Sequence, residues 1–243
     1  RLQLPLEWLG YEVDYFTITS PAALPALNAE YQAIILPRFL QIAPTMEAPL
    51  ITWLLAQRAA GRKLIVAGSL PFRDPEQRAR FQQAFGLTGT GAALIRPARL
   101  ETIALDPAGF DFEARVPIEP VAAFDLRAPA DARRFLSLRA RPATGPAVEI
   151  DPVFTCSWGG LALDPFVTFR RGDSVELWRV NPFTFLQLAL GAAPAPAPDT
   201  TTRNGRRLLL SHIDGDGFSN FSRVDPGRRA AEIIRDRILK KYP

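Results

Sequence analysis

The 243 residues are 47% hydrophobic and 22% charged, enough for one large domain or two small ones with a buried core. The formal net charge of +4 comes mostly from arginines that are scattered among acidic residues, which argues against a nucleic-acid-binding surface. No apolar run approaches the roughly 20 residues needed to span a bilayer, and the single cysteine, Cys156, excludes an intramolecular disulfide.

The first residues predict a helix over Leu2–Leu9 that ends at Gly10, followed by a short alternating strand over Tyr11–Phe16. An α/β domain rarely begins with a helix. We therefore expect that a strand ahead of this helix is missing, and that the chain starts inside or at the edge of its domain.

A right-handed βαβ unit is predicted next. The apolar run Ala33–Pro37 reads as a buried strand, Thr45 as the N-cap of a helix that ends at Gly61, and Lys63–Ala67 as a strand covered on both faces. A second helix follows, with Asp74 and Pro75 at its start and Gly86 at its end. Each helix has apolar residues at helical spacing. In the first helix they are Met46, Leu50, Trp53, Leu54 and Ala56, and in the second they are Phe81, Ala84 and Phe85.

Between residues 92 and 180 the pattern changes to short β-like runs separated by Pro and Gly. We interpret this portion as an added antiparallel sheet or a β-rich insertion. The runs are Ala92–Ile95, Phe135–Arg139, Val148–Phe154, Phe166–Arg170 and Ser174–Arg179. Together with a short helix that Asn181 and Pro182 cap and Gly191 ends, they complete an α/β accessory domain over residues 1–191.

The Ala-Pro alternation of Ala192–Pro198 predicts a stiff, extended linker, which we place at residues 192–205. Beyond the Asn204-Gly205 turn, residues 206–243 predict a strand over Arg207–Ile213 and an amphipathic helix from Pro226 to Lys241, capped by Asp225. Its expected buried face is Ala230, Ile234 and Ile238. One strand and one helix cannot form a domain, so we expect this second domain to continue beyond the sequence.

The densest polar cluster, Ser211 to Phe218 (S-H-I-D-G-D-G-F), stands where that strand ends. Asp214 and Asp216 are two residues apart, so in an extended segment their carboxylates point the same way. One could hold a divalent metal and the other accept a proton from water. A glycine-rich turn whose aspartates accept backbone hydrogen bonds fits the spacing equally well. An EF-hand loop fits less well, because the required glutamate is absent.

The segment R-R-L-L-L-S-H-I-D-G-D-G-F, after D-T-T-T-R-N-G, resembles the start of the deacetylase domain of the PelA family of Pel exopolysaccharide proteins. Three upstream segments resemble the family's middle region, so the likeness covers nearly the whole chain: P-L-E-W-L-G-Y-E-V-D-Y (5–15), S-W-G-G (157–160) and V-N-P-F-T-F-L (180–186). The resemblance implies an open, mostly parallel, flavodoxin-like sheet with a β-rich addition, then the first βα unit of an incomplete deacetylase barrel.

The resemblance also implies roles. Asp214 would be the general base and Asp216 a ligand of zinc or a similar metal, with His212 as a further possible ligand. The intervening Gly215 departs from the adjacent aspartates of most polysaccharide deacetylases and agrees with the PelA type. The family's remaining ligands are a later histidine pair, and His212 is the only histidine here. We therefore expect no bound metal in this chain alone.

The flavodoxin-like fold is shared with class I glutamine amidotransferases, which need a nucleophilic cysteine at a strand-to-helix elbow. After Lys63–Ala67 this chain has Gly68-Ser69-Leu70-Pro71 instead. Ser69 has no histidine in its own domain to activate it, and Cys156 falls in a β-like segment where a buried, apolar role is expected. Trp158 and Trp178 could stack on sugar rings, although a core role is expected for each.

By resemblance, the parent protein removes acetyl groups from an extracellular amino-sugar polymer of a biofilm matrix, as a carbohydrate-modifying hydrolase. Its expected compartment is periplasmic or extracytoplasmic, although no signal peptide is present in these residues. Expected partners are the acetylated polysaccharide and other exopolysaccharide export proteins, without nucleic acid or a membrane span. The alternative is a non-catalytic module that binds the polymer or a partner protein.

Overall fold

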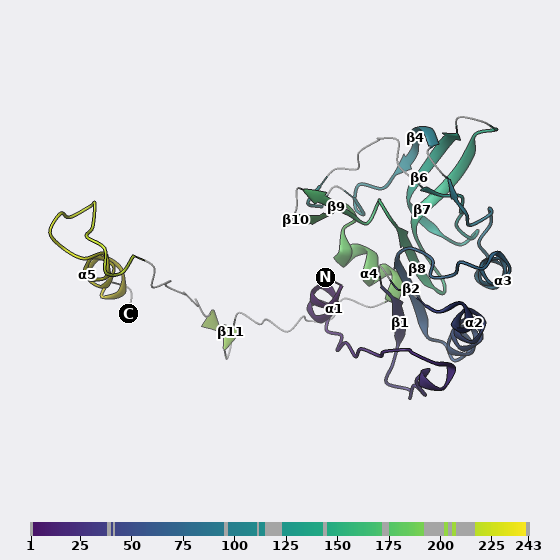
Figure 1. The fold of residues 1–243 in the computed structure, drawn as a ribbon, viewed down its shortest axis with the longest axis horizontal. Helices are drawn as coiled ribbons and strands as arrows, with labels where there is room; N and C mark the ends of the chain where they lie inside the picture. Colours follow the sequence, from purple (N-terminus) through teal and green to yellow (C-terminus); the bar gives the residue numbers. More distant parts are fainter. Residues whose placement is uncertain are drawn as a thin grey trace. The chain divides into compact units, whose positions relative to one another are not determined.

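The chain forms two compact units, Arg1–Pro198 and Asp199–Pro243 (Figure 1). The structure is a computed structural model, and it describes residues 2–37, 40, 42–94, 97–110, 112–114, 123–142, 145–171, 175–191, 202–203, 206–207 and 217–241. None of the helices described there is long and apolar enough to cross a membrane.

The first unit is built on a mixed six-stranded sheet. The strands, in spatial order, are β1 (Ala33–Leu36), β2 (Lys63–Gly68), β8 (Gly159–Leu163), β7 (Val148–Cys156), β6 (Arg133–Pro142) and β4 (Pro97–Leu105). β1, β2 and β8 pair parallel to one another, and the pairs β8–β7, β7–β6 and β6–β4 are antiparallel. The α/β class is as expected. The sheet is not mostly parallel, however, because the β-rich residues extend the same sheet.

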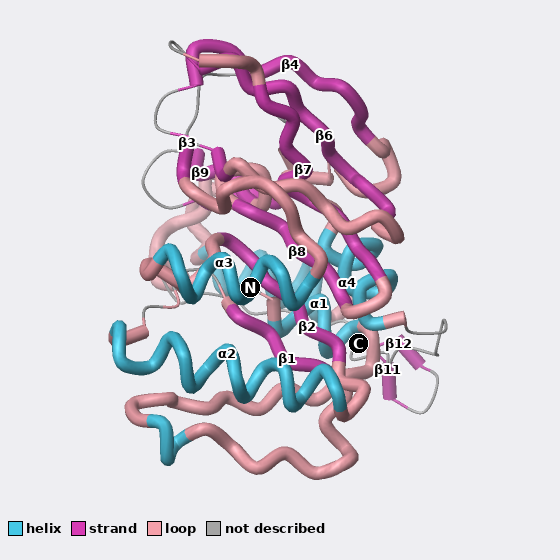
Figure 2. The backbone as a smooth tube through the Cα atoms, turned by 90° about the vertical axis from the view of Figure 1, so that its right-hand side faces the viewer, coloured by secondary structure: helices cyan, strands magenta, loops and turns pink. Residues whose placement is uncertain are grey.

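Helices cover both faces of this sheet (Figures 1 and 2). On one face lie α2 (Pro44–Ala59) and α3 (Pro75–Phe85); on the other lie α1 (Gln3–Trp8) and α4 (Pro182–Leu190). β2 shows why: Leu64 and Val66 belong to the apolar cluster with α2 and α3, whereas Ile65 belongs to the cluster with α1 and α4. Successive strand residues face opposite ways, so a continuous apolar strand needs both layers.

Two short strand pairs and a 3₁₀ turn complete the first unit. β9 (Thr168–Arg171) and β10 (Val175–Trp178) form an antiparallel pair, close to two of the predicted runs. β3 (Ala93–Leu94) pairs antiparallel with β5 (Ala123–Phe124). The 3₁₀ turn η1 (Pro21–Ala23) lies in the connection between α1 and β1, next to α2.

The predicted caps of α3 and α4 are confirmed. The Asp74 carboxylate accepts the Glu76 N–H, and the Asn181 side chain accepts the N–H groups of Phe183 and Thr184. Gly86 and Gly191, at φ 68° and 65°, end the two helices in the left-handed conformation.

The predicted start of α2 was wrong. Its N-cap is Ala43, and Thr45 lies inside the first turn. Pro44 explains the difference: its fixed φ suits the first helical position, and it has no N–H that would need a cap.

The strand predicted over Tyr11–Phe16 was also wrong, because these residues join no sheet. Side chains hold them in place instead. The Tyr15 hydroxyl donates to Gln3 Oε1 (3.0 Å), the Tyr31 hydroxyl donates to Asp14 (2.7 Å), and Tyr11 packs against the core with Val13. The alternating pattern therefore indicates which side chains are covered. It does not show that a neighbouring strand is present to form the hydrogen bonds of a sheet.

In the second unit, β11 (Thr202–Arg203) and β12 (Arg206–Arg207) pair antiparallel, as the predicted Asn204-Gly205 hairpin requires. The final helix consists of α5 (Ala230–Ile234) and a π-helical turn, η2 (Arg235–Leu239). It begins four residues later than Pro226, because Gly227 adopts a φ of 97° that no helix contains. The linker Ala192–Pro198 and the strand predicted after Arg207 lie outside the described residues.

The expected apolar face of that helix was only partly right. Ile233 is the buried residue, while Ala230 and Ile234 are half-buried and Ile238 is 53% exposed. The buried side of this helix is therefore centred on Ile233, which is one residue and so about 100° around the helix from Ile234.

A test of the fold concerns the contact between β2 and β8. A Cβ at Gly159 (φ 138°) would lie 2.0 Å from the Leu64 carbonyl oxygen. We expect Gly159→Ala to lower the free energy of unfolding by more than about 3 kcal/mol, since backbone strain of about 1–3 kcal/mol adds to a steric clash. The control is Gly61→Ala, where φ is 85° and no atom lies within 4 Å, so only strain of about 1–2 kcal/mol applies.

The measurement is urea unfolding followed by tryptophan fluorescence. All four tryptophans (Trp8, Trp53, Trp158 and Trp178) lie in the first unit, so the signal reports that unit alone. Equal losses in the two variants would contradict the close contact.

Candidate functional site

The residues predicted to carry chemistry, His212, Asp214 and Asp216, lie outside the described residues. The chain that follows them is described from Gly217. It forms a turn in which Asn220 N–H donates to the Gly217 carbonyl, and it then meets the start of α5. Ala230 and Ala231 donate their N–H groups to the carbonyls of Asn220 and Phe218 (2.9 and 3.4 Å). The loop after the motif is therefore hydrogen-bonded to the first turn of α5.

Asp236 is the most strongly perturbed carboxylate among the described residues of the second unit. Arg235 is 2.9 Å from it and Lys240 3.1 Å, and Arg228 forms a third ion pair. Hydrogen bonds from Arg235, then Lys240 and Arg228, hold the pKa of Asp236 well below its usual range. Three cations already surround this carboxylate, so its environment is that of an ion-pair cluster and not of a metal ligand.

No group of three or more His, Cys, Asp or Glu side chains in the described ranges could hold a metal ion. A catalytic zinc site takes three protein ligands and water.

In the first unit, the edge after β2 is where an α/β enzyme of the amidotransferase type would carry its nucleophile. Gly68 has a φ of 106°, and its carbonyl accepts the Asp164 N–H (2.6 Å). Ser69, the next residue, has no hydrogen bond from its side chain to a His or Glu among those described. The nearby buried carboxylate, Glu47, accepts the N–H groups of Arg73 and Asp74, both at 3.0 Å. Glu47 thus fixes the turn into α3.

Cys156 ends β7 and has the partly buried position expected of an apolar cysteine. Burial raises the pKa of its thiol to about 11. Nucleophilic cysteines need the opposite shift, because the thiolate is the reactive form. The described geometry gives Cys156 a packing role.

The two tryptophans considered for sugar stacking are core residues. Trp158 is 5% exposed, donates its indole N–H to the Phe85 carbonyl (3.0 Å) and contacts the rings of Phe85 and Phe154 edge-on. Trp178 is 9% exposed. The low exposure of both side chains confirms the expected core role, although Trp178 also lies on the wall of the groove described below.

The segments that resemble the family's middle region have structural roles in this unit. In S-W-G-G, Ser157 N–H donates to Asp131, Trp158 fills the core, and Gly159 admits the β2 backbone. In V-N-P-F-T-F-L, Asn181 caps α4, whose buried residues include Phe185 and Leu186. These segments are therefore accounted for by packing and capping.

A buried acidic residue that the sequence did not single out lies on β7. Asp151 is 1% exposed and accepts hydrogen bonds from Ala128 N–H (3.0 Å), the Ser137 hydroxyl (2.6 Å) and Arg134 (3.3 Å). Arg127 lies 3.7 Å away. The carboxylate is fully partnered, which identifies a structural ion network joining β6, β7 and the segment before β6.

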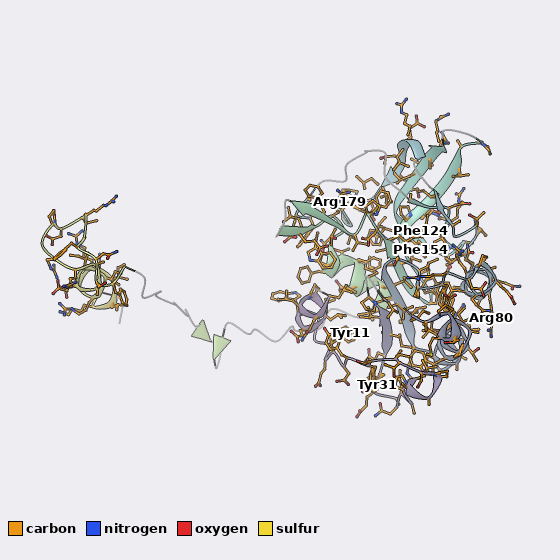
Figure 3. The ribbon with its side chains drawn as sticks, viewed as in Figure 1. Tyr11, Tyr31, Arg80, Phe124, Phe154 and Arg179 are labelled. Atoms are coloured by element: carbon orange, nitrogen blue, oxygen red, sulfur yellow. The ribbon has the colours of Figure 1, made fainter. Side chains whose placement is uncertain are left out.

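The described part of the first unit also contains a groove of about 980 Å³ that the sequence did not indicate. It lies between residues 10–16 and the free edge of β1, and both Tyr11 and Tyr31 (labelled in Figure 3) line it. Its walls are mainly apolar, including Leu6, Val13 and Ile35. Apolar concavities are the usual places for a ligand or a polypeptide segment.

Comparison with known proteins gave no family: no protein-family model, curated protein or solved structure matched the chain. Any assignment of function must come from the residues and the geometry described above.

Cys156 provides a test of the site assignment. Raising a thiol pKa from about 9 to about 11 lowers the thiolate fraction at pH 8 by about 100-fold, so we expect iodoacetamide to alkylate Cys156 about 100-fold more slowly in the folded protein than in urea. The rate should increase tenfold per pH unit up to pH 10. Folded and unfolded rates within threefold of each other at pH 8 would contradict the buried, inert assignment.

Proposed function

We propose that the chain is part of a metal-dependent polysaccharide N-deacetylase that acts on an extracellular amino-sugar polymer outside the cytoplasm. The observation that carries the proposal is the S-H-I-D-G-D-G-F segment at residues 211–218, placed after an apolar run and before a helix. The first unit is then a flavodoxin-like accessory domain, and the second unit begins the deacetylase domain.

Two features of the described residues support this division. The first unit has its catalytic candidates occupied in packing, since Cys156 is buried with a raised pKa and Glu47 accepts two backbone N–H groups. The second unit exposes large apolar side chains both in the loop before α5 (Phe221 and Val224) and in η2 (Ile238 and Leu239). Exposed apolar groups so close together favour a unit whose core needs further polypeptide.

In the proposed reaction, Asp214 accepts the proton of the water that attacks the acetamide carbonyl, and Asp216 holds the metal, with His212 as a possible further ligand. The metal, zinc or similar, would supply a positive charge that acidifies water and stabilises the negative charge developing on the carbonyl oxygen. The segment has too few metal-binding side chains to complete a site, which predicts that the remaining ligands come from residues after Pro243.

A second candidate is a non-catalytic module that binds the polymer or a partner exopolysaccharide export protein. The first unit favours this candidate, because its two apolar clusters form a buried core and its described residues include no assigned catalytic group. The two candidates separate in one experiment that measures acetate release and retention of the polymer by the same protein. Retention without acetate release by the full protein would favour the module.

Metal binding tests the ligand assignment. We expect the 243-residue chain to bind Zn²⁺ or Co²⁺ weakly or not at all by calorimetry, because Asp216 with at best His212 or Asp214 offers too few ligands. The full protein should bind one equivalent tightly. Tight stoichiometric zinc in the 243-residue chain would contradict the claim that its site is incomplete.

Two substitutions in the full protein separate the aspartates. Asp216→Ala should lose metal and acetate release together, whereas Asp214→Asn should keep the metal and lower kcat by about 10²–10⁴-fold, because only the proton acceptor is removed. The control is Asp225→Asn, a carboxylate nine residues after Asp216 that pairs with Arg228 at 3.5 Å; it should leave turnover unchanged. Undiminished turnover in Asp214→Asn would refute the role of Asp214.

A further inference from the structure

We propose that the groove beside β1 is the place of one more strand of the sheet, parallel to β1 and supplied by the polypeptide that leads into α1. The groove lies between residues 10–16 and β1, and has a volume of about 980 Å³. The proposal concerns the architecture of the first unit and is independent of the catalytic roles assigned above. It rests only on the chain being a segment of a longer polypeptide.

The free edge of β1 presents unpaired ladder groups to the groove. β1 pairs parallel with β2, and Lys63 N–H donates to the Gln32 carbonyl (2.9 Å). In a parallel pair of strands, alternate residues direct their backbone groups toward the neighbouring strand. Given this hydrogen bond, the N–H groups of Ile34 and Leu36 point toward β2, whereas the N–H and carbonyl of Ile35 point away from it. No strand among the described residues pairs with that edge. β1 is half-buried except for the buried Leu36, and backbone groups shielded from water need partners, which a neighbouring strand supplies.

The groove passes between the two helix layers, which distinguishes it from a surface pocket. Leu6 and Leu190 line it from the α1 and α4 layer, while Leu50 and Trp53 line it from the α2 layer. A strand placed here would direct alternate side chains into the two layers and would be apolar on both faces, as β2 is.

Segment 11–16, on the side of the groove opposite β1, lies where a further strand of the sheet would lie. The Tyr15 hydroxyl donates to Gln3 Oε1 (3.0 Å), which brings the end of segment 11–16 next to the first residue of α1. α1 and this segment therefore run antiparallel, like the helix and second strand of a βαβ unit. Val13 and Tyr11 pack on the core, but the segment joins no sheet. A strand in the groove would give it a ladder partner.

The position of α1 indicates the source of the strand. The connection from β1 to β2 crosses the sheet in one direction, and its helix, α2, lies on one face. A connection from the proposed strand through α1 to segment 11–16 would cross the sheet in the opposite direction. A right-handed crossover in that direction requires α1 to lie on the other face. α1 is on that face, packed against α4 through Trp8 and Phe183 (ring centroids 6.1 Å apart). A strand from a separate chain would impose no such requirement.

The rim of the groove also carries aromatic and acidic side chains, among them Tyr11, Tyr31 and Glu12, which could suit a sugar. Thr168, Glu176 and Trp178 line the groove as well. The strand is favoured because the edge of β1 lies along the groove and because Asp14 is already bound by the Tyr31 hydroxyl. A saccharide is therefore the competing outcome of the test.

The test is hydrogen exchange resolved at single amides. The full protein, a form of it that begins at Arg1, and the 243-residue chain are compared, with Ile34 as the internal reference because its N–H is directed at β2. In the two forms that begin at Arg1, we expect the Ile35 amide to exchange more than about 100-fold faster than Ile34. In the full protein the two amides should be protected within about tenfold. N-acetylglucosamine oligomers are added to the 243-residue chain as the saccharide probe.

Three results would overturn the proposal. Fast exchange at Ile35 in the full protein would mean that no strand pairs there, and slow exchange in the form that begins at Arg1 would assign the edge to another polypeptide. Protection of Ile35 by the sugar oligomers would assign the groove to a saccharide. None of these results depends on acetate release, so the deacetylase proposal stands or fails separately.

Discussion

The first unit depends on the burial of β2 between two helix layers. Leu64, Ile65, Val66 and Ala67 are each at most 3% exposed, and successive members face opposite layers. Burying an apolar side chain of this size contributes about 1.5–3 kcal/mol, so both faces must be covered for the strand to be stable. The arrangement of α2 and α3 on one side and α1 and α4 on the other follows from that requirement. So does the close approach of β8, where Gly159 admits the β2 backbone.

Capping and periodicity allowed the helices and the parallel β1–β2 pair to be predicted, because these signals are local. Asp74, Asn181, Gly86 and Gly191 act within four residues of their own positions. The sheet order is not local. β8 was missed because Gly159 and Gly160 lower the strand signal, although the glycines are needed for contact with β2 and with α4. The β-rich residues were predicted as an addition, since no local pattern states that β7 pairs with β8.

The candidate chemistry divides in the same way. The negative assignments for Cys156, Trp158 and Trp178 could be made from sequence context, and burial agrees with them. The partnered carboxylates Glu47 and Asp151 could not be anticipated, because their partners come from residues 14 to 27 positions away. Each is a charge kept inside the protein by donors from a neighbouring turn or strand, which makes it part of the fold. The acidic pair Asp214 and Asp216 stays a prediction from sequence alone.

The ion cluster around Asp236 makes the end of the chain sensitive to ionic strength. Its three cationic partners, Arg228, Arg235 and Lys240, are at least 38% exposed, so dissolved ions can screen all of these pairs. The pKa of Asp236 is lowered in the folded state, so its stabilising contribution is present above the ordinary pKa of an aspartate and is lost as the pH falls through the lowered value. High salt therefore weakens the terminal helix at neutral pH, whereas the first unit, which depends on apolar burial, keeps its stability.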